Sequence, residues 1–290
     1  MRVLVTGAAG FLGRHVANHL LTQGHAVTGF DLARGDHPDI RWIQGDLGDF
    51  GSVDAAVVGH DVICHIGAVG DVYLAAEQPE LAARANVVGC AHIGRAGASH
   101  RARVVYASTW EVYGSPRYEP IDEDHPCDPD HPYSITKLAG ERMLIAADRL
   151  HDVPVLALRL GTSYGSGLRP NSVFRIFIDK ARRGEPITIQ GDGAQGRQFT
   201  HASDIARAFV LACTSDLRRR TLNIVAPVTI SIKELAEAVV ARYPTELSFG
   251  SPRPGDVAPA LVSAERAAHE LGWRAEMDFE SGFSELMDAH

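Results

Sequence analysis

Cysteine is scarce in this sequence, and the few cysteines do not form the patterns of a disulfide framework or a zinc site. They are far apart along the chain and include no Cys-x-x-Cys pair: Cys64, Cys90, Cys127 and Cys213. Scattered thiols of this kind are typical of reduced, cytosolic proteins. Histidine does not supply a metal site instead, since His15 and His19 have helical i, i+4 spacing but lack a third ligand. We therefore expect no metal.

Long apolar runs and an excess of positive charge are missing as well. No apolar run approaches the roughly 18 residues that a membrane-spanning helix needs. The chain enters a strand-like run at once, as MRVLVTG, without the basic and apolar segments of a signal peptide. Its formal net charge of -8 argues against nucleic-acid binding through phosphate neutralisation. We expect a cytoplasmic protein that binds neither membranes nor nucleic acids and holds any anionic ligand with local arginines.

The first half of the chain alternates between strand-like and helix-like segments. Apolar runs rich in β-branched residues predict strands, and apolar positions at helical spacing predict helices between most of them. This alternation indicates an α/β fold with a doubly wound parallel sheet, which binds ligands at the carboxyl ends of its strands. The predicted strands are Arg2–Thr6, His25–Asp31, Ile40–Asp46, Asp61–Gly67, Arg103–Ser108 and Val155–Leu160, and the predicted helices are Phe11–Gly24, Pro79–Ala98 and Ile135–Leu150.

The second half of the chain has a different character, which begins at about Gly165. The stretches TSYGSGLRPNS and TIQGDGAQGRQFTH are rich in loop-forming residues, and helices lie between and beyond them. SIKE, at Ser231–Glu234, fits a capping box that starts a helix at Ile232–Arg242. We predict two domains, residues 1–165 and a smaller α/β domain of residues 166–290. The strand-like run Thr221–Val225 leaves room for part of the second to return to the main sheet.

The sequence TGAAGFLG places Gly7, Gly10 and Gly13 between the first strand and the first helix. A dinucleotide pyrophosphate requires a tight turn, a close approach of the backbone and helix N-terminal amides aimed at the phosphates. The G-x-x-G-x-x-G spacing is one residue wider than the common fingerprint. Its position directly after a strand and before a helix predicts a dinucleotide-binding loop.

Acidic residues at the ends of the next two strands bear on the choice of dinucleotide. Asp31 ends the second strand, where a carboxylate accepts hydrogen bonds from the adenosine ribose and repels a 2′-phosphate. This favours NAD over NADP, although the nearby Arg34 would accommodate a phosphate. Asp46 follows the third strand, and either an adenine contact or a solvated turn is consistent with its position.

YSITK places Tyr133 and Lys137 at i and i+4, on one face of a helix. An ammonium about 5 Å from the phenol, at an effective dielectric near 20, favours the phenolate by about 3 kcal/mol. That would lower the tyrosine pKa by about two and make Tyr133 a usable base. Ser108 or Thr109, 24 to 25 residues earlier, is placed to share a substrate hydroxyl's hydrogen bond.

With these motifs, the sequence resembles the extended short-chain dehydrogenase/reductase superfamily, in its nucleotide-sugar epimerase/dehydratase branch. The resemblance covers nearly the whole chain through TGAAGFLG, VICHIGA, ASTWEVYG, YSITK, LRLGTSYG, GDGAQGRQFTHASDIA and RPGDV. It implies a Rossmann domain that binds NAD tightly, a smaller domain that binds a nucleoside-diphosphate sugar, and a homodimer.

The resemblance also implies roles for individual residues. Thr109, Tyr133 and Lys137 match the catalytic Ser/Thr, Tyr and Lys, and Lys137 would also hold the nicotinamide ribose. Arg197 and Arg253 would pair with the substrate diphosphate and Asp256 with its ribose. Thr162 replaces an asparagine that contacts the substrate in many members. The resemblance further implies NAD contacts at Phe11, Leu12, Leu47, His65 and Ala68. At His65 and Ala68 these contacts would be made through the backbone.

Glu111, in ASTWEVYG, bears on which reaction follows. In this branch Tyr133 would take a proton from the sugar 4-hydroxyl while a hydride passes from C4 to NAD, and a 4-epimerase then returns the hydride to the other face. Dehydratases typically have Thr-Asp-Glu here, whereas this chain has Thr109-Trp110-Glu111 and so lacks the acid. Glu111 resembles the base of dehydratases and the glutamate of uronic-acid decarboxylases, or it only lines the pocket.

The favoured hypothesis is an NAD-dependent 4-epimerase acting on a UDP-hexose or UDP-hexuronate. The alternatives are a 4,6-dehydratase or UDP-glucuronate decarboxylase that uses Glu111, an NAD(P)H-dependent ketoreductase of a 4-keto sugar, and a non-catalytic NAD(P) sensor.

Overall fold

The computed structural model describes residues 1–251 and 260–289. Its centre is a sheet of seven parallel strands that confirms the predicted doubly wound α/β architecture. The six strands predicted in the first half are all present, with ends that shift by a few residues at most. Across the sheet the strands are β11 (Arg220–Ile224), β6 (Val155–Leu160), β5 (Arg103–Thr109), β4 (Val62–His65), β1 (Arg2–Thr6), β2 (Ala26–Asp31) and β3 (Arg41–Gln44).

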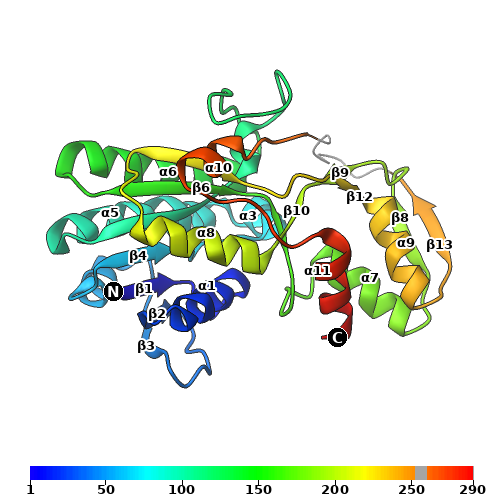
Figure 1. Ribbon diagram of the computed structural model, residues 1–290, viewed down its shortest axis with the longest axis horizontal. Helices are drawn as coiled ribbons and strands as arrows, with labels where there is room; N and C mark the ends of the chain where they lie inside the picture. Colours follow the sequence, from blue (N-terminus) through cyan, green and yellow to red (C-terminus); the bar gives the residue numbers. More distant parts are fainter. Residues whose placement is uncertain (252–259, 290) are drawn as a thin grey trace.

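Helices cover both faces of this sheet (Figure 1). One face carries α1 (Phe11–Thr22) and α8 (Ala202–Thr214), and the other carries α2 (Phe50–Val57), α5 (Gly89–His100) and α6 (Pro132–His151). Apolar residues of α1 recur at helical spacing, at Val16, Ala17 and Leu20, and all are buried. Alternate residues of β1 therefore enter different cores: Val3 and Val5 pack with α1 and α8, whereas Leu4 packs with α2 and α5.

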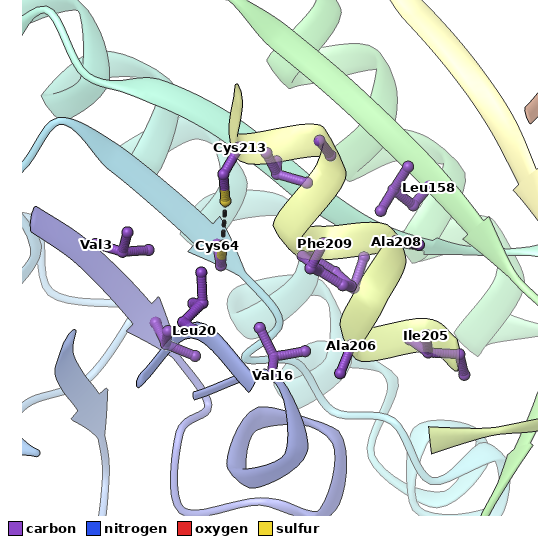
Figure 2. Packing of buried hydrophobic residues seen from close by; sticks show 14 of the residues in the cluster. Val3, Val16, Leu20, Cys64, Leu158, Ile205, Ala206, Ala208, Phe209 and Cys213 are labelled. Atoms are coloured by element: carbon purple, nitrogen blue, oxygen red, sulfur yellow. Dashed lines mark hydrogen bonds between the residues drawn. The ribbon is translucent and has the colours of Figure 1, made fainter. Parts of the chain in front are cut away.

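Figure 2 shows the core beneath α8, where Phe209 and Ala208 pack beside Val16 of α1 and Leu158 of β6. Cys64 of β4 and Cys213 of α8 meet in this core with their sulfur atoms 3.4 Å apart. All four cysteines are free thiols. Because α8 follows Gly165 in the chain, residues of the second half contribute to the main sheet's core.

The connection from β4 to α5 is an interrupted helix. It comprises α3 (Val72–Glu77), α4 (Pro79–Ala83) and a π-helical turn, η1 (Arg84–Val88), before α5 begins. The sequence predicted one helix over Pro79–Ala98. The π turn inserts an extra residue per turn, a feature that occurs often at functional sites.

The remaining segments gather at one end of the molecule (Figure 1). Their apolar residues form a separate core with a group of stacked aromatic rings, including Tyr164, Phe174 and Phe199. Thr188–His201, predicted as loop, instead contains three short strands or strand ends. The elements at this end are β7 (Thr162–Tyr164), α7 (Val173–Arg182), β8 (Ile187–Gln190), β9 (Gly196–Arg197), β10 (Phe199–His201), β12 (Ile230–Ser231), α9 (Ile232–Arg242), β13 (Leu247–Gly250) and α11 (Phe279–Asp288). The short helix α10 (Glu265–Glu270) instead packs against β11 of the main sheet.

Two details of the second half match the sequence pattern closely. The capping box at Ser231 and Glu234 is present, and α9 spans Ile232–Arg242 as predicted. Thr221–Val225 does return to the main sheet, because β11 pairs in parallel with β6. Within the described part of the chain, none of the helices has both the length and the apolarity to span a membrane.

Candidate active site

The glycine-rich loop joins β1 to α1 at the point where the strand order reverses, between β1 and β4. Gly7 has φ +69°, and a Cβ there would lie 2.6 Å from the Cα of Gly67. A Cβ on Gly13 would lie 1.9 Å from the carbonyl oxygen of Gly7. Gly10 is the N-cap residue of α1. The three glycines therefore allow a backbone cradle at a helix N-terminus, which suits a pyrophosphate.

Asp31 closes this cradle at the end of β2. Its carboxylate accepts a hydrogen bond from the Ala9 N–H, 3.0 Å away. The side chains of Phe11 and Leu12 turn away into the cores of the second half and of the α1–α8 face. Contacts from these two positions to a dinucleotide would thus involve backbone amides.

The residues after β3 and β4 that are predicted to contact the dinucleotide differ in their surroundings. Asp46 accepts a hydrogen bond from the Gly48 N–H and forms an ion pair with Arg84, with 2.7 Å between nitrogen and oxygen. Leu47 lies beside the backbone of Gly67 and Gly89. If Asp46 contacts the adenine, its carboxylate would do so while it is also paired with Arg84. Ala68 is exposed in the loop after β4.

His65 is buried, and its ring hydrogen-bonds to Thr6 at the end of the neighbouring strand β1. The Thr6 hydroxyl accepts hydrogen bonds from the N–H groups of Ile66 and Gly67. Its own hydrogen is therefore left to donate to Nδ1 of His65, 2.8 Å away. Nε2 then carries the ring proton and faces Cys90. Burial and, to a smaller extent, the Lys137 ammonium lower the pKa of His65 to about 3, so the ring is neutral.

Thr109, Tyr133 and Lys137 come together where the end of β5 meets the first turns of α6. His131 caps α6 by accepting the Tyr133 N–H, and Pro132 occupies the first turn. The Thr109 side chain hydrogen-bonds to Tyr133. Lys137 is 3% exposed, with its ammonium 4.4 Å from the centre of the Tyr106 ring. The structure thus places the hydroxyl partner, the phenol and the ammonium in one region.

The predicted effect of Lys137 on Tyr133 is wrong for the polypeptide alone. Burial raises the pKa of the Tyr133 phenol, and the Glu111 carboxylate raises it further. The Thr109 hydrogen bond and the Arg169 guanidinium lower the pKa, and neither is Lys137. The reason is that the ammonium is directed over the Tyr106 ring. Spacing along a helix predicted the shared face but not this orientation.

Ser108 is not available to a substrate hydroxyl, which corrects its prediction as a catalytic candidate. Its hydroxyl donates a 2.7 Å hydrogen bond to Glu141 on α6, and the side chain is buried. Glu141 is in turn paired with Arg159 of β6. The arrangement leaves Thr109, one residue further along β5, as the hydroxyl beside Tyr133.

Glu111 lies in the 3-10 turn η2 (Trp110–Tyr113), close enough to Tyr133 for its carboxylate to raise the phenol pKa. Burial raises the pKa of its carboxyl, and Arg197 lowers it. The neighbouring Trp110 is 7% exposed and packs with Tyr113 and Val225. Glu111 is therefore close enough to interact with both the phenol and an arginine predicted to bind phosphate.

A small cavity lies beside η2. Arg197 of β9 lines it together with Trp110 and Gly161, the neighbour of Thr162. Thr162 is half-buried at the start of β7, where it pairs with Phe199. Arg253 and Asp256 lie outside the described residues.

Two site residues were not predicted. Asn86, in the π turn η1, donates to the Thr136 hydroxyl and the Val69 carbonyl and accepts the Val69 N–H. It thereby ties α6 to the loop after β4. Arg169 lies close enough to Tyr133 to lower the phenol pKa. A polar residue inside an apolar helix pattern was the available signal for Asn86, whereas nothing in the sequence distinguished Arg169 from other loop arginines.

Comparisons with known proteins agree with this geometry. The family model of the NAD dependent epimerase/dehydratase family matches residues 3–224. A putative UDP-glucose 4-epimerase of Methanocaldococcus jannaschii is 30% identical over 99% of this chain and 97% of its own length. A dTDP-glucose 4,6-dehydratase of Streptomyces niveus is 28% identical over 99% and 92%. The solved structure of MoeE5 in complex with UDP-glucuronic acid and NAD superposes with a TM-score of 0.92 at 32% identity, covering 100% of this chain and 98% of that one.

The family match extends from the glycine-rich loop through Tyr133 and Lys137 to β11. The family is named after NAD, and the glycine cradle, whose space added Cβ atoms would fill, suits this dinucleotide. This chain is a member of the NAD-dependent epimerase/dehydratase family.

Proposed function

We propose that this protein is an NAD-dependent 4-epimerase of a nucleoside-diphosphate sugar, with a UDP-hexose or a UDP-hexuronate as substrate. The choice of nucleotide is supported by relatives such as the UDP-glucose 4-epimerase and by MoeE5, which binds UDP-glucuronic acid. Bound NAD would accept a hydride from sugar C4 and return it to the opposite face. The chain's own residues hold the two ligands and move the 4-hydroxyl proton.

The proton would be taken by Tyr133. Thr109 hydrogen-bonds to the phenol and is placed to hold the same sugar oxygen. The guanidinium of Arg169 favours the phenolate, whereas the carboxylate of Glu111 opposes it. After the 4-keto sugar turns over, Tyr133 would return the proton to O4. Asp31 would hold the adenosine ribose, and Arg197, with Arg253 and Asp256, the substrate's diphosphate and ribose.

The observation that carries the choice of epimerisation is the environment of Trp110. Removing the 6-hydroxyl as water requires an acid and a base near C5 and C6. The indole at position 110 cannot donate a proton to a leaving hydroxyl, and it is packed into an apolar cluster. A 4-epimerase needs only the proton transfer at O4. The site therefore supports epimerisation better than 4,6-dehydration.

A second candidate rests on Glu111. Its pKa is raised by burial, and it lies close to Tyr133, so it has the character of a group that could exchange a proton with sugar C5. We keep decarboxylation of UDP-glucuronate as this alternative. The electrons left by loss of carbon dioxide would enter the 4-keto group as an enolate, Glu111 would deliver a proton to C5, and C4 would then regain the hydride.

The decisive experiment is incubation of the purified protein with UDP-glucose and with UDP-glucuronate, followed by NMR of the products. We expect the C4 epimer of one of them and no net consumption of cofactor. A 4-keto-6-deoxy sugar or a pentose would overturn the proposal in favour of dehydration or decarboxylation. Stoichiometric consumption of NADPH with a 4-keto sugar would instead indicate a ketoreductase. Cofactor binding without selective sugar-nucleotide binding would indicate a sensor.

We also propose a homodimer in the cytoplasm. The supporting feature is an apolar surface on α4, η1 and α6, which pack against one another. We call it the α4–α6 face; its exposed apolar residues are Leu81, Val88, Ile135, Met143 and Leu150. The free thiols are consistent with a reducing compartment.

A further inference from the structure

A buried carboxylate lies one helical turn beyond Lys137. Glu141 is 1% exposed and Lys137 3% exposed, and their i, i+4 spacing puts both on the face of α6 that meets β5. Glu141 accepts the hydroxyl of Ser108 at 2.7 Å and two N–H groups of Arg159, at 3.1 and 2.7 Å. It therefore has three charge-assisted hydrogen bonds from two neighbouring strands.

The two strands, β5 and β6, connect Glu141 to the candidate active site. Ser108 and Arg159 are register partners in β5 and β6, and Ser108 is followed by Thr109. The Arg159 guanidinium lies 4.7 Å from the centre of the Tyr113 ring in η2, the turn that carries Glu111. Figure 1 shows α6 beside β6. The Glu141 carboxylate thus links the helix carrying Tyr133 to the strand end carrying Thr109.

The charges around Lys137 give this carboxylate a second effect. Burial lowers the pKa of Lys137, Cys90 and Glu141 oppose this, and the resulting pKa is about 8. The other titratable groups that face the ammonium are neutral near pH 7, because the pKa of His65 is about 3, that of Cys90 is about 11 and that of Tyr106 is raised. Among the described residues facing Lys137, Glu141 is the charged one that favours the ammonium.

We propose that Glu141 is a positioning residue: it keeps Lys137 protonated and holds the Tyr133–Lys137 face of α6 against the end of β5. Its relevance to turnover rests on the proposed function and on the role that the family resemblance implies for Lys137, which would hold the nicotinamide ribose beside Tyr133. The effect on Lys137 itself does not, and it can be measured without any turnover.

A purely structural ion pair would behave differently. Replacing a buried ion pair with apolar residues of similar volume is often neutral or stabilising, because the pair's desolvation cost disappears. If Glu141 only held the helix in place, the double variant Glu141→Met/Arg159→Met would retain both a folded protein and normal lysine chemistry. The proposal predicts a folded protein with altered lysine chemistry.

The direct test uses the protein's small number of lysines. The sequence contains three, Lys137, Lys180 and Lys233, so lysine labelled with ¹⁵N at Nζ gives three signals to titrate in the NAD-bound protein. In Glu141→Gln we expect the Lys137 pKa to fall by about one or more, while the other two stay unchanged as internal controls. Glu141→Asp, which keeps the charge, should stay near the wild type. The double Met variant should fold and show the lowered pKa.

Turnover gives the second readout. Loss of the Lys137 proton on raising pH should reduce kcat, so in Glu141→Gln the alkaline fall of kcat should move to lower pH by the same amount as the NMR pKa. If the Lys137 pKa falls by one, kcat should fall roughly tenfold at any pH above the pKa values of both proteins. KM for the nucleotide sugar should change by about twofold at most. The matched control is Glu237→Gln, an exposed glutamate on α9.

An unchanged Lys137 pKa in Glu141→Gln would overturn the proposal, as would normal kcat in the double Met variant. Failure of the proposed function would look different: the wild-type protein would epimerise no nucleotide sugar, whereas the lysine titration would still show the effect of Glu141.

Discussion

At the scale of single residues, Glu111 has two electrostatic partners. Its carboxylate raises the pKa of Tyr133, while Arg197 favours the charged form of Glu111 itself. A negative charge beside the phenol works against its role as a base. In an epimerase that does no chemistry at C5, this charge would only tune Tyr133.

We predict that Glu111→Gln retains epimerase activity within about tenfold and shifts its pH dependence. Removal of the carboxylate lowers the Tyr133 pKa, so kcat should begin to rise at a lower pH than in the wild type. Glu111→Asp keeps the charge and should leave the profile nearly unchanged. The measurement is kcat against pH with saturating nucleotide sugar. A loss of more than about a thousandfold in the glutamine variant would show that Glu111 transfers a proton.

Tyr133 itself gives a second prediction at this scale. Tyr133→Phe removes the hydroxyl that exchanges the 4-hydroxyl proton, so we expect kcat to fall by at least about 10³-fold. The phenyl ring occupies nearly the same volume, and binding of NAD and of the nucleotide sugar, measured by calorimetry, should remain within a few fold. Turnover close to that of the wild type would contradict the role of Tyr133 as the base.

At the scale of elements, the junction of β1 and α1 depends on close backbone contact. Gly13 lies in the first turn of α1, and its Cα faces the carbonyl of Gly7 so closely that a side chain has no space. The contact involves backbone on both sides, so a side-chain rotation cannot relieve it. The helix would have to move away from the strand, and the cradle at its N-terminus would open.

Gly13→Ala should therefore destabilise the protein by about 3 kcal/mol and weaken NAD binding by at least about tenfold. Gly51→Ala is the matched control, because a Cβ there meets only Asp49 oxygens, at 3.7 Å or more. Alanine is also a better helix former than glycine, so this control should be equally or slightly more stable. Urea unfolding and NAD titration measure the two effects. Equal stabilities of the two variants would contradict the close packing.

At the scale of the whole molecule, buried His65 makes the free energy of unfolding depend on pH. The unfolded chain takes up a proton on this ring below its ordinary pKa of 6.5, whereas the folded protein does so only near pH 3. Unfolding is thus accompanied by proton uptake between these values. Stability is greatest above about pH 6.5 and falls on acidification, by about 1.4 kcal/mol per pH unit from this group.

We predict that His65→Gln makes the free energy of unfolding depend less steeply on pH between pH 4 and 6, because unfolding then takes up about one proton fewer. The amide can still accept the Thr6 hydroxyl but does not titrate. Urea unfolding at several pH values, with cofactor absent, gives the slopes. The glutamine variant need not be as stable as the wild type at pH 7, since only the slope is compared. Parallel curves for the two proteins would contradict neutral burial of His65.

Assembly also belongs to the whole molecule. If the α4–α6 face pairs two copies, Met143→Glu should shift the protein from dimer to monomer in analytical ultracentrifugation, because it places a charge among apolar residues. Val58→Glu, at another exposed apolar residue, should leave the assembly unchanged. A dimer that tolerates the Met143 change would contradict pairing through this face.

The sequence by itself determined the strands of the first half, the glycine-rich loop and the common face of Tyr133 and Lys137. These are local properties, because strand and helix periods, caps and turn glycines depend on residues a few positions apart. The capping box at Ser231 and the six first-half strands could be predicted for this reason. The shared face of α6 followed from i, i+4 spacing alone.

Tertiary structure alone decided which hydroxyl serves the site, how Lys137 is directed and where Asn86 acts. Ser108 and Thr109 are adjacent and chemically alike, and only the packing of α6 and β6 assigned the first to Glu141 and left the second beside Tyr133. The pKa values of Lys137 and Tyr133 depend on burial by segments far apart in the chain. Such effects sum over neighbours in space, and the spacing of residues along the sequence does not specify them.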